Sequence, residues 1–417
     1  MNQSNILVLS NNCFSKGNSN GRTMMNMLKQ IPKENLAQFY ISGNPDMDFC
    51  NNYFQVSDQD AKNAFLLRKK VKKEDKPKDE NKNKDKKPKE VKKNCKNLYI
   101  RNLVWRSYMW WKKDFDKFLQ DFNPQIVLLQ AGDSPFMYAI AMKIAKKYKC
   151  KLVMFNTENY VLKKYMYSSI KKKNFWHSLL QSALKKQYKK IMSCVDYCIY
   201  SCEGLEAAYQ EAYPHPNKSD TIYTVSELDV LPDASGDPFT IVYCGNLGVG
   251  RDATLNRLAQ IIYEVDPTVK LEIYGKFLSE EAEKVVCANE NVVYKGFIDY
   301  EEIPAVMSRA SMLLHCEHTG RLENLRYAFS TKIADSLASG RPFLVCATRE
   351  YPFVQYLEEN QCAHIASTAT ELKEVLKKCI DDKEYRYKYQ ENAKAVALKN
   401  HSEESNCQKL EKILEEL

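Results

Sequence analysis

Short apolar segments alternate along this chain with longer segments that have helical spacing. Residues Gln125–Leu129 form a continuous apolar run, which is typical of a strand buried on both faces of a parallel sheet. The same pattern predicts strands in the first half at Ile6–Leu9, Phe39–Ser42, Gln125–Leu129, Lys151–Phe155 and Tyr197–Tyr200. Helices are expected between them, at about Arg22–Ile31, Val104–Phe122, Ser134–Lys149, a long basic helix ending near Met192, and one starting at Glu203. Strands that alternate with helices build an α/β, doubly wound sheet.

A second α/β pattern starts after Leu231–Pro238, whose two prolines, glycine and small polar residues indicate a linker. Further strands are expected at Thr240–Cys244, Lys270–Tyr274, Val292–Lys295, Met312–His315, Phe343–Val345 and Ala363–Ala366. A chain of 417 residues fits two domains of about 200 residues each. We expect two Rossmann-like domains that face one another across a cleft, residues 1–232 and 233–417. The last helical segment, from Glu384 to the end, is a candidate to pack back on the first domain.

The net charge of +9 is concentrated in one segment. Residues 69–96 hold 14 Lys and six acidic residues, a balance of +8, with few apolar residues. This composition predicts a disordered basic insertion. Three readings are open for it: a solvated insertion, attraction to anionic lipid headgroups, and nucleic-acid binding, which we do not expect. The adjoining Val104–Lys113 holds three of the four Trp; they suit either a membrane interface or packing into the domain. Residues 69–113 are therefore a candidate for peripheral contact with an anionic membrane.

Fourteen Cys without regular spacing favour a reducing compartment, and no zinc or other metal site is expected. The first apolar segment is a short strand and no segment approaches the length of about 18 apolar residues that spans a bilayer. We expect a cytoplasmic protein, with the inner face of the membrane as a candidate location.

Phe329–Val345 is the most informative segment for chemistry. It predicts a helix that begins with the hydroxyls of Ser330 and Thr331 and carries Lys332 in its first turn. A helix N-terminus with a cation suits a diphosphate. Asp335 lies one turn after Thr331 on the same face, where a carboxylate suits the hydroxyls of a ribose. This combination indicates a sugar nucleotide.

Glycine-containing loops follow three neighbouring strands of the second half. The first contains Gly245 and Asn246 and ends with Arg251, which can bind two phosphate oxygens. The next two loops bring Lys276 and then Phe297 and Ile298 to the same edge, where Lys276 and Ile298 can read a base and Phe297 can pack on it. The alternative is that the glycines only make turns and Phe297 is core. The glycine spacing differs from the dinucleotide fingerprint, which disfavours NAD.

The order of these motifs, G-N-L-G-x-x-R, Y-G-K, N-V-x-Y-x-G-F-I and S-T-K-I-A-D-S-L-A-S-G-R-P, resembles the nucleotide-binding half of GT-B glycosyltransferases. It is most similar to the retaining family 4 group that builds bacterial polysaccharides, over about Ile241–Ala366. The resemblance implies that Arg251 and Lys332 clamp the donor diphosphate, that Asp335 holds the ribose, and that neither a metal nor a cofactor is needed.

The chain departs from this family at one position. Members commonly carry a Glu-x7-Glu motif whose second Glu stands at the position of Asp335. Eight residues before Asp335, where the first Glu is expected, this chain has Tyr327. Glu323, in the preceding loop, is the candidate to contact the donor sugar instead.

The resemblance assigns the acceptor to the first half. It implies a glycine-rich loop near the donor phosphates, where Gly17 and Gly21 fit. Asp133 and Glu158 follow the third and fourth strands and are candidates to orient or deprotonate an acceptor hydroxyl, or else serve as helix caps or surface residues. In a retaining mechanism the donor phosphate can also accept the proton.

The sequence therefore predicts a metal-independent, retaining hexosyltransferase that moves a sugar from a UDP- or GDP-linked donor to a glycan or lipid-linked glycan. Two alternatives remain: an inactive GT-B scaffold that binds nucleotide sugars or a partner, and a nucleotide-sugar epimerase.

Overall fold

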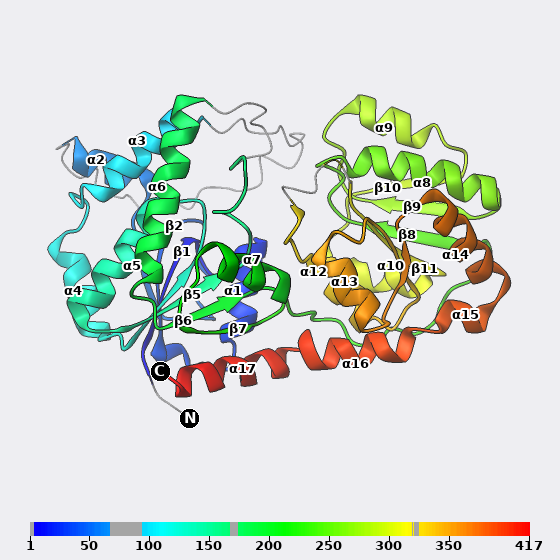
Figure 1. Ribbon diagram of the computed structural model, residues 1–417. Helices are drawn as coiled ribbons and strands as arrows, with labels where there is room; N and C mark the ends of the chain where they lie inside the picture. The colour runs from blue at the N-terminus through cyan, green and yellow to red at the C-terminus, as the bar shows by residue number, and fades with distance from the viewer. Residues whose placement is uncertain (1–3, 67–93, 167–173, 319, 321–324) are drawn as a thin grey trace. The chain divides into compact units, whose positions relative to one another are not determined.

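The computed structural model describes residues 4–66, 94–166, 174–318, 320 and 325–417 (Figure 1). The chain divides into two compact units, Met1–Ile222 with Cys407–Leu417, and Tyr223–Asn406. The boundary between the two units thus lies between Ile222 and Tyr223, before the predicted linker Leu231–Pro238. The linker segment itself packs in the second unit. Arg341, which is almost fully buried, makes an ion pair of 2.8 Å with Asp233 and donates to the carbonyl of Ala310.

The first unit contains a seven-stranded sheet in which all neighbouring strands are parallel, in the order β3-β2-β1-β4-β5-β6-β7. Its strands are β1 (Ile6–Asn12), β2 (Leu36–Ser42), β3 (Asn52–Gln55), β4 (Ile126–Gln130), β5 (Lys151–Asn156), β6 (Tyr197–Tyr200) and β7 (Lys218–Thr221). The sequence pattern missed β3 and β7. Both are short edge strands with polar residues, so they lack the apolar run on which the prediction depends.

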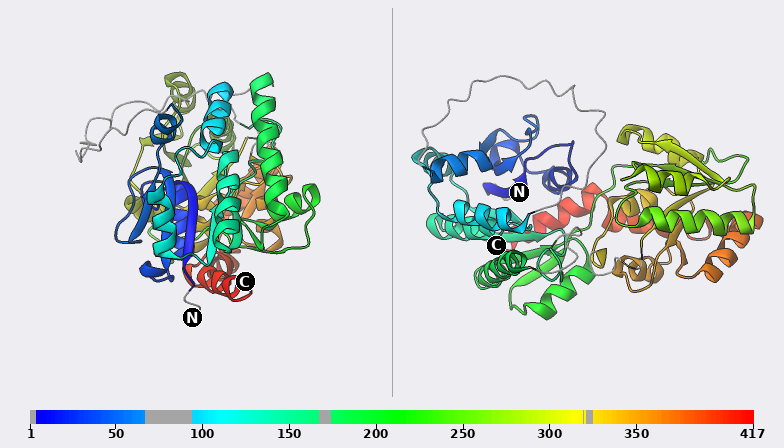
Figure 2. Two further views of the ribbon diagram at one scale, coloured as in Figure 1. Left: turned by 90° about the vertical axis from the view of Figure 1, so that its left-hand side faces the viewer. Right: turned by 90° about the horizontal axis from the view of Figure 1, so that it is seen from above.

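Helices cover this sheet (Figure 2). They are α1 (Ser19–Leu28), α2 (Asp58–Phe65), α3 (Cys95–Arg106), α4 (Lys113–Phe122), α5 (Pro135–Tyr148), α6 (Phe175–Met192) and α7 (Glu203–Ala212), with a 3-10 turn, η1, at Lys33–Asn35. The single helix expected at Val104–Phe122 is wrong. The structure has two helices there, because Tyr108 adopts a left-handed conformation with φ 55° after α3 ends.

The Trp-rich segment belongs to the core of the first unit. Trp105 and Trp110 are 0% and 4% exposed, and Trp105 stacks on Phe136 with ring centroids 4.8 Å apart. Of the two readings of Val104–Lys113, packing into the domain therefore applies to these two rings. Residues 69–93 of the expected basic insertion lie outside the described residues. Its last residues, Cys95 and Lys96, already belong to α3, whose N-cap is Asn94.

The second unit contains a parallel six-stranded sheet in the order β10-β9-β8-β11-β12-β13. Its strands are β8 (Thr240–Cys244), β9 (Lys270–Tyr274), β10 (Val292–Gly296), β11 (Met312–Cys316), β12 (Phe343–Cys346) and β13 (His364–Ala366). Its helices are α8 (Arg251–Val265), α9 (Glu280–Cys287), α10 (Ile303–Arg309), α12 (Thr331–Ala338), α13 (Pro352–Glu359), α14 (Ala369–Asp381), α15 (Lys383–Tyr387) and α16 (Gln390–Asn400), with a 3-10 turn, η3, at Tyr300–Glu302.

The C-terminal segment from Glu384 is three helices rather than one, ending in α17 (Glu403–Glu415). Leu410, Ile413 and Leu414 of α17 lie in one apolar cluster with Ile6 and Val8 of β1. The end of the chain thus completes the core of the first unit. No helix in the described ranges combines the length and apolar content needed to cross a membrane. Two Rossmann-like units of parallel strands confirm the predicted α/β fold class.

Candidate functional site

Lys332 lies directly over the glycine loop that follows β8. A Cβ atom added to Gly245 would stand 1.8 Å from Lys332 Nζ and 2.3 Å from its Cε. A side chain at position 245 would therefore displace the end of this lysine from its place over the loop. The loop after β9 comes equally close to the loop after β8, since a Cβ on Gly275 would stand 2.0 Å from the Gly245 carbonyl oxygen. The loops after β8 and β9 and the start of α12 thus meet around one ammonium group.

The Lys332 ammonium has no hydrogen bond or ion pair with any residue that the structure describes. Its Nζ lies 5.2 Å from the centre of the Tyr243 ring. Burial, reinforced by the positive charge of Arg251, lowers the pKa of Lys332 to about 8. The charge of Glu317, which pairs with Arg251, offsets this lowering only in part, so an anion bound beside Lys332 would stabilise its ammonium.

The start of α12 adds hydrogen-bond donors to these charges. Ser330 is the N-cap residue, and its side chain makes no capping hydrogen bond to the helix. Thr331, the first helical residue, is exposed. The first amides of α12 and the positive end of its dipole therefore lie beside Lys332, as the sequence predicts for an anion site.

Arg251, the first residue of α8, is held by a carboxylate that the sequence did not assign to it. Its Nη2 atom lies 2.6 Å from Glu317 Oε1, and the two side chains are 12% and 6% exposed. Burial opposes ionisation of both groups. The Glu317 charge nevertheless raises the pKa of Arg251, while His315 and Arg251 together lower the pKa of Glu317. Arg251 Nε and Glu317 Oε2 have no hydrogen-bond partner in the described structure.

His315 completes this buried cluster from β11. Its Nε2 atom lies 3.5 Å from Glu317 Oε1, and its ring packs edge-on against Phe353. Burial lowers the pKa of His315, which favours the neutral ring. The sequence analysis assigned no role to His315 or Glu317. The signal that could have found them is the polar pair His315 and Glu317 at the carboxyl end of an otherwise apolar strand.

Asp335 faces a different set of partners from Lys332. It is 7% exposed, and its Oδ1 accepts hydrogen bonds from Ser226 Oγ at 2.8 Å and from Tyr300 OH at 3.4 Å. It shares a cavity of about 40 Å³ with Lys332 and His315. The carboxylate is thus close to the cation but is already oriented by two hydroxyl groups.

The loop between β8 and α8 has a strained backbone. Val249 has φ 61°, a conformation that a β-branched residue rarely adopts. Asn246 stabilises the turn, since its Oδ1 accepts from the amide of Gly248 at 2.7 Å. Strain of this kind costs about 1–3 kcal/mol and concentrates at ligand sites.

Phe297 is not a core residue, so the structural alternative for it is wrong. Its side chain is 61% exposed, and Lys276 Nζ lies 4.6 Å from the centre of its ring. Ile298 beside it is half-buried. The amide of Gly275 donates to the Gly296 carbonyl at 2.8 Å, which joins the loops that carry these residues. Glu323 lies outside the described residues, and Tyr327 is half-buried.

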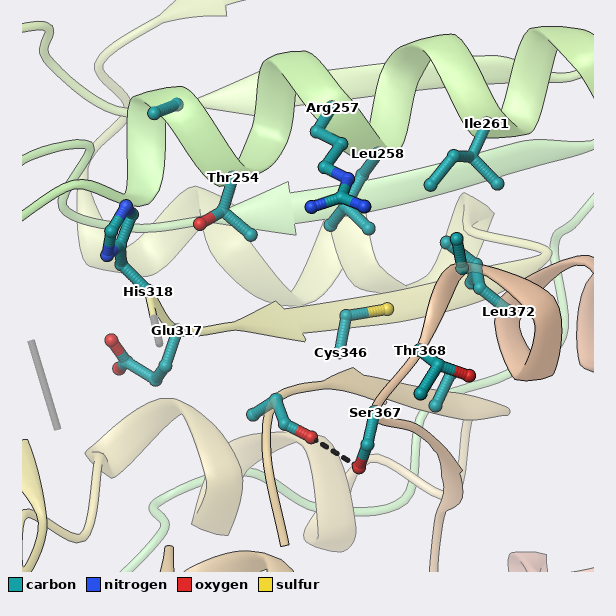
Figure 3. Close-up of a pocket in the computed structure, with 14 residues that line it drawn as sticks. Thr254, Arg257, Leu258, Ile261, Glu317, His318, Cys346, Ser367, Thr368 and Leu372 are labelled. Carbon is teal, nitrogen blue, oxygen red and sulfur yellow. Dashed lines mark hydrogen bonds between the residues drawn. The ribbon is translucent and has the colours of Figure 1, made fainter. Parts of the chain in front are cut away.

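A cavity of about 220 Å³ lies between α8 and the start of α14 (Figure 3). Arg257, Thr254, Cys346 and Thr368 line it, while the Glu317 carboxylate points away from its middle. Ser367 Oγ donates to the Ala347 carbonyl at 2.8 Å. Glu317, the partner of Arg251, also lines this cavity, so the cavity adjoins the cluster that contains Lys332.

The candidates in the first unit have nearer and simpler partners. Asn18 Oδ1 accepts from the amide of Gly21 and caps α1. A Cβ on Gly21 would stand 2.5 Å from the Cys13 carbonyl oxygen, whereas one on Gly17 would meet Ser15 Oγ at 3.6 Å, which is an ordinary contact. The close approach of α1 to the loop after β1 therefore requires glycine at 21 alone.

Asp133 and Glu158 follow β4 and β5, which are neighbours in the sheet. Asp133 accepts from Ser134 Oγ at 3.2 Å. Glu158 is 49% exposed and lies 3.6 Å from Lys163. The structure thus brings both carboxylates to one edge of the sheet, with partners that a surface role would also explain.

Comparison with known proteins agrees with this geometry. Residues 253–412 match the family model described as glycosyl transferase-like. No curated protein matches the chain. Among solved structures, Anabaena Alr3699/HepE in complex with UDP is similar with a TM-score of 0.66 at 12% identity, covering 99% of this chain and 100% of the other.

Two further structures show the same fold. Sucrose-phosphate synthase from Thermosynechococcus elongatus has a TM-score of 0.63 at 12% identity, with 99% of each chain covered. The lipopolysaccharide outer core galactosyltransferase WaaB has a TM-score of 0.60 at 11% identity, covering 99% of this chain and 100% of the other.

The chain therefore has the GT-B fold, and most of the residues that match the glycosyl transferase-like family model lie in its second unit. The resemblance to GT-B glycosyltransferases that the motifs indicated is confirmed.

Proposed function

We propose that this protein is a metal-independent, retaining glycosyltransferase that moves a hexose from a UDP- or GDP-linked donor to a glycan or lipid-linked glycan. The observation that carries the proposal is the Lys332 ammonium, which lies over Gly245 without a counter-ion among the described residues. With Arg251 and the first amides of α12, it supplies the charge that a leaving nucleoside diphosphate needs. No metal ion is then required to neutralise that charge.

We assign the remaining donor contacts to side chains near the carboxyl edge of the second sheet. Phe297 offers an exposed ring on which a base can stack, and Lys276 and Ile298 flank it. Asp335 is buried one turn after Thr331, where it can accept hydrogen bonds from the ribose hydroxyls. Glu323 is the candidate for the donor sugar. HepE structures contain UDP, and UDP with glucose, which favours uridine as the base.

We assign the acceptor to the first unit, with Asp133 or Glu158 as the group that orients or deprotonates its hydroxyl. Gly17 and Gly21 belong to the loop that we assign to the donor phosphates. The proposed setting is bacterial polysaccharide synthesis in the cytoplasm, at the inner face of a membrane. The anionic membrane surface is proposed to attract residues 69–113, whose lysines carry most of the net charge.

The test is a thermal-shift titration of the full chain with UDP, GDP, ADP and NAD, with and without Mg²⁺. A ligand that binds only the folded state raises the unfolding temperature. We expect UDP or GDP to do so equally in EDTA. The matched variants are Arg251→Ala and Arg257→Ala, since both residues lie on α8 but Arg257 is exposed and makes no ion pair in the described structure. Only Arg251→Ala should weaken the shift.

An absence of any nucleotide shift would overturn the proposal. Nucleotide binding without turnover of UDP- or GDP-sugars would favour the inactive scaffold, for which Tyr327 in place of the usual Glu is the specific observation. Epimerised nucleotide sugar without an acceptor would favour the epimerase.

A further inference from the structure

Large apolar side chains are exposed at one part of the first unit. In its described residues, six such side chains are exposed, and five of them lie on α2, α3 and α6. These five are Phe65 at 42%, Leu66 at 47%, Ile100 at 45%, Leu103 at 49% and Phe175 at 68% exposure. Met47 is the sixth. Single exposed apolar residues are ordinary, but a gathering of this kind marks an interaction surface.

The three helices form one side of the unit (Figures 1 and 2). Arg101 of α3 makes an ion pair of 2.6 Å with Asp58 of α2. Two residues earlier on α3, the ring of Tyr99 lies 6.1 Å from the ring of Trp176 on α6, between centroids. Lys96 Nζ, near the start of α3, lies 5.7 Å from the centre of the same Trp176 ring. The outward face of α3 carries Ile100 and Leu103, three positions apart and flanked by exposed Lys96 and Arg106. We call the five apolar residues, with Lys96 and Trp176, the α2-α3-α6 surface.

The charge around this surface is mostly positive. The sequences of α3 and α6 contain no acidic residue. The two acidic residues of α2 are engaged at its N-terminus, Asp58 by Arg101 and Trp105, and Asp60 by the capping box with Ser57. The lysine-rich residues 67–93 join the chain directly after Leu66 and before the cap of α3, and Lys171, Lys172 and Lys173 directly precede the cap of α6. Each apolar helix end therefore adjoins cationic sequence.

Apolar side chains surrounded by cations fit an anionic bilayer. Phe, Leu and Ile enter the boundary between headgroups and acyl chains, while lysines remain at the phosphates. A nucleic acid would use the same lysines through its phosphates, but it offers no apolar layer for Ile100, Leu103 and Phe175. A protein partner would not need the net charge of the adjoining sequence.

We propose that the α2-α3-α6 surface docks the protein on an anionic lipid bilayer. This deepens the membrane contact proposed above and rests on that part of the proposal alone. It also changes which side chains make the proposed membrane contact. Trp105 and Trp110 are buried, so Ile100, Leu103 and Phe175 are the side chains that would enter the bilayer. Docking at this face would bring the first unit, to which we assign the acceptor, to a lipid-linked glycan in the bilayer.

The test measures co-sedimentation of the full chain with vesicles of phosphatidylglycerol and phosphatidylcholine, compared with phosphatidylcholine alone. The test variant replaces Ile100, Leu103 and Phe175 by Ser, and the control variant replaces Met47 and Leu398, which are 61% and 71% exposed. All five side chains are exposed, so both variants should unfold at the temperature of the unchanged protein. We expect the test variant to bind anionic vesicles at least about tenfold more weakly, and the control variant to bind as the unchanged protein does.

Three outcomes would overturn the proposal: equal binding by the test variant, equal binding to neutral vesicles, or preference for RNA over anionic vesicles with no effect of the three substitutions. UDP binding by the same variants separates this result from the proposed function. A test variant that loses vesicle binding but keeps its UDP shift supports the surface, whatever the outcome for turnover.

Discussion

The carboxyl edges of the two sheets have the same architecture, but they differ in the partners of their charged side chains. At the second sheet, Lys332 has no counter-ion among the residues that the structure describes, and Arg251 is held by a buried carboxylate. At the first sheet, Asp133 and Glu158 have near polar neighbours, and Glu158 is half-exposed. A cation that is shielded from water without a neighbouring negative charge lowers the stability of the fold unless an anionic ligand binds beside it. The second edge is thus prepared for one anionic ligand, whereas the first edge can adapt to a neutral, hydroxyl-rich one.

Substitutions at the first edge should give the largest effect, and on turnover only. We expect at least one of Asp133→Asn and Glu158→Gln to lower the turnover number by about a hundredfold or more, because a positioned general base contributes that much. Neither should change UDP affinity or the unfolding temperature, since Glu158 is 49% exposed and its ion pair with Lys163, at 3.6 Å, is weak. Steady-state kinetics beside UDP titration measures both. Unchanged turnover in both variants would move the proton acceptor to the donor phosphate.

Removal of Arg251 should give the next largest effect, and it should appear in both stability and binding. Arg251→Ala leaves Glu317 buried without its cation, and breaking a buried pair in this way costs about 3–5 kcal/mol of unfolding free energy. Arg251→Ala combined with Glu317→Gln removes the orphaned charge. Urea unfolding should therefore show recovery of stability in the double variant, while UDP binding stays weak. A double variant as unstable as the single one would contradict the role of Glu317.

Lys332 should contribute to binding but not to stability. Lys332→Ala removes a charge-assisted phosphate contact worth about 1.5–3 kcal/mol, so UDP affinity should fall by about one to two orders of magnitude. The unfolding temperature should not fall, because the substitution also removes an ammonium that makes no ion pair with any described residue. Titration calorimetry and thermal unfolding test the two statements. A loss of stability with intact UDP affinity would make Lys332 a structural residue.

The pH dependence follows from the lowered pKa of Lys332, about 8. In the folded protein its charge is lost as pH rises through about 8, whereas the unfolded chain keeps the proton to higher pH. Lys332 therefore destabilises the fold below about pH 8, and this penalty is relieved as pH rises further. UDP affinity should fall over the same rise, and Lys332→Arg should bind UDP without that fall. Equal pH profiles for the two proteins would contradict the assignment.

The sequence predicted the parts of the structure that depend on local pattern. The apolar strands, the start of α12 and the glycine loop after β8 appear where the pattern placed them. The break of Val104–Phe122 into α3 and α4 was not predicted, because the left-handed Tyr108 is not a residue type that marks a helix end. The approach of Lys332 to Gly245 also joins residues far apart in the chain, and no local pattern contains it.

The roles of Glu317 and His315 were missed for a related reason. In a sequence, a carboxylate next to a glycine-containing loop is most simply interpreted as a surface residue. Only the folded structure shows that Glu317 is 6% exposed and lies 2.6 Å from Arg251. For Phe297 the sequence left two interpretations open. As an aromatic after a strand it fits a core as well as a ligand, and its exposed fraction alone separates the two. Charge compensation and exposure are properties of the folded chain rather than of composition.

Substitution of Phe297 should give the smallest effect, and it tests how the carboxyl edge of the second sheet recognises the donor. Phe297→Ala should weaken UDP binding by about 1–3 kcal/mol, the contribution of one aromatic ring stacked on a base. Stability should be unaffected because the ring is already 61% exposed. Tyr263→Ala, an exposed aromatic on α8 that pairs with Glu290, is the matched control. Affinity for UDP should fall in the Phe297 variant alone, while affinity for inorganic diphosphate, which has no base, should stay the same in both. A parallel loss of diphosphate binding would show that Phe297 supports the loop around Lys276 rather than the base, and the donor edge would then recognise phosphate alone.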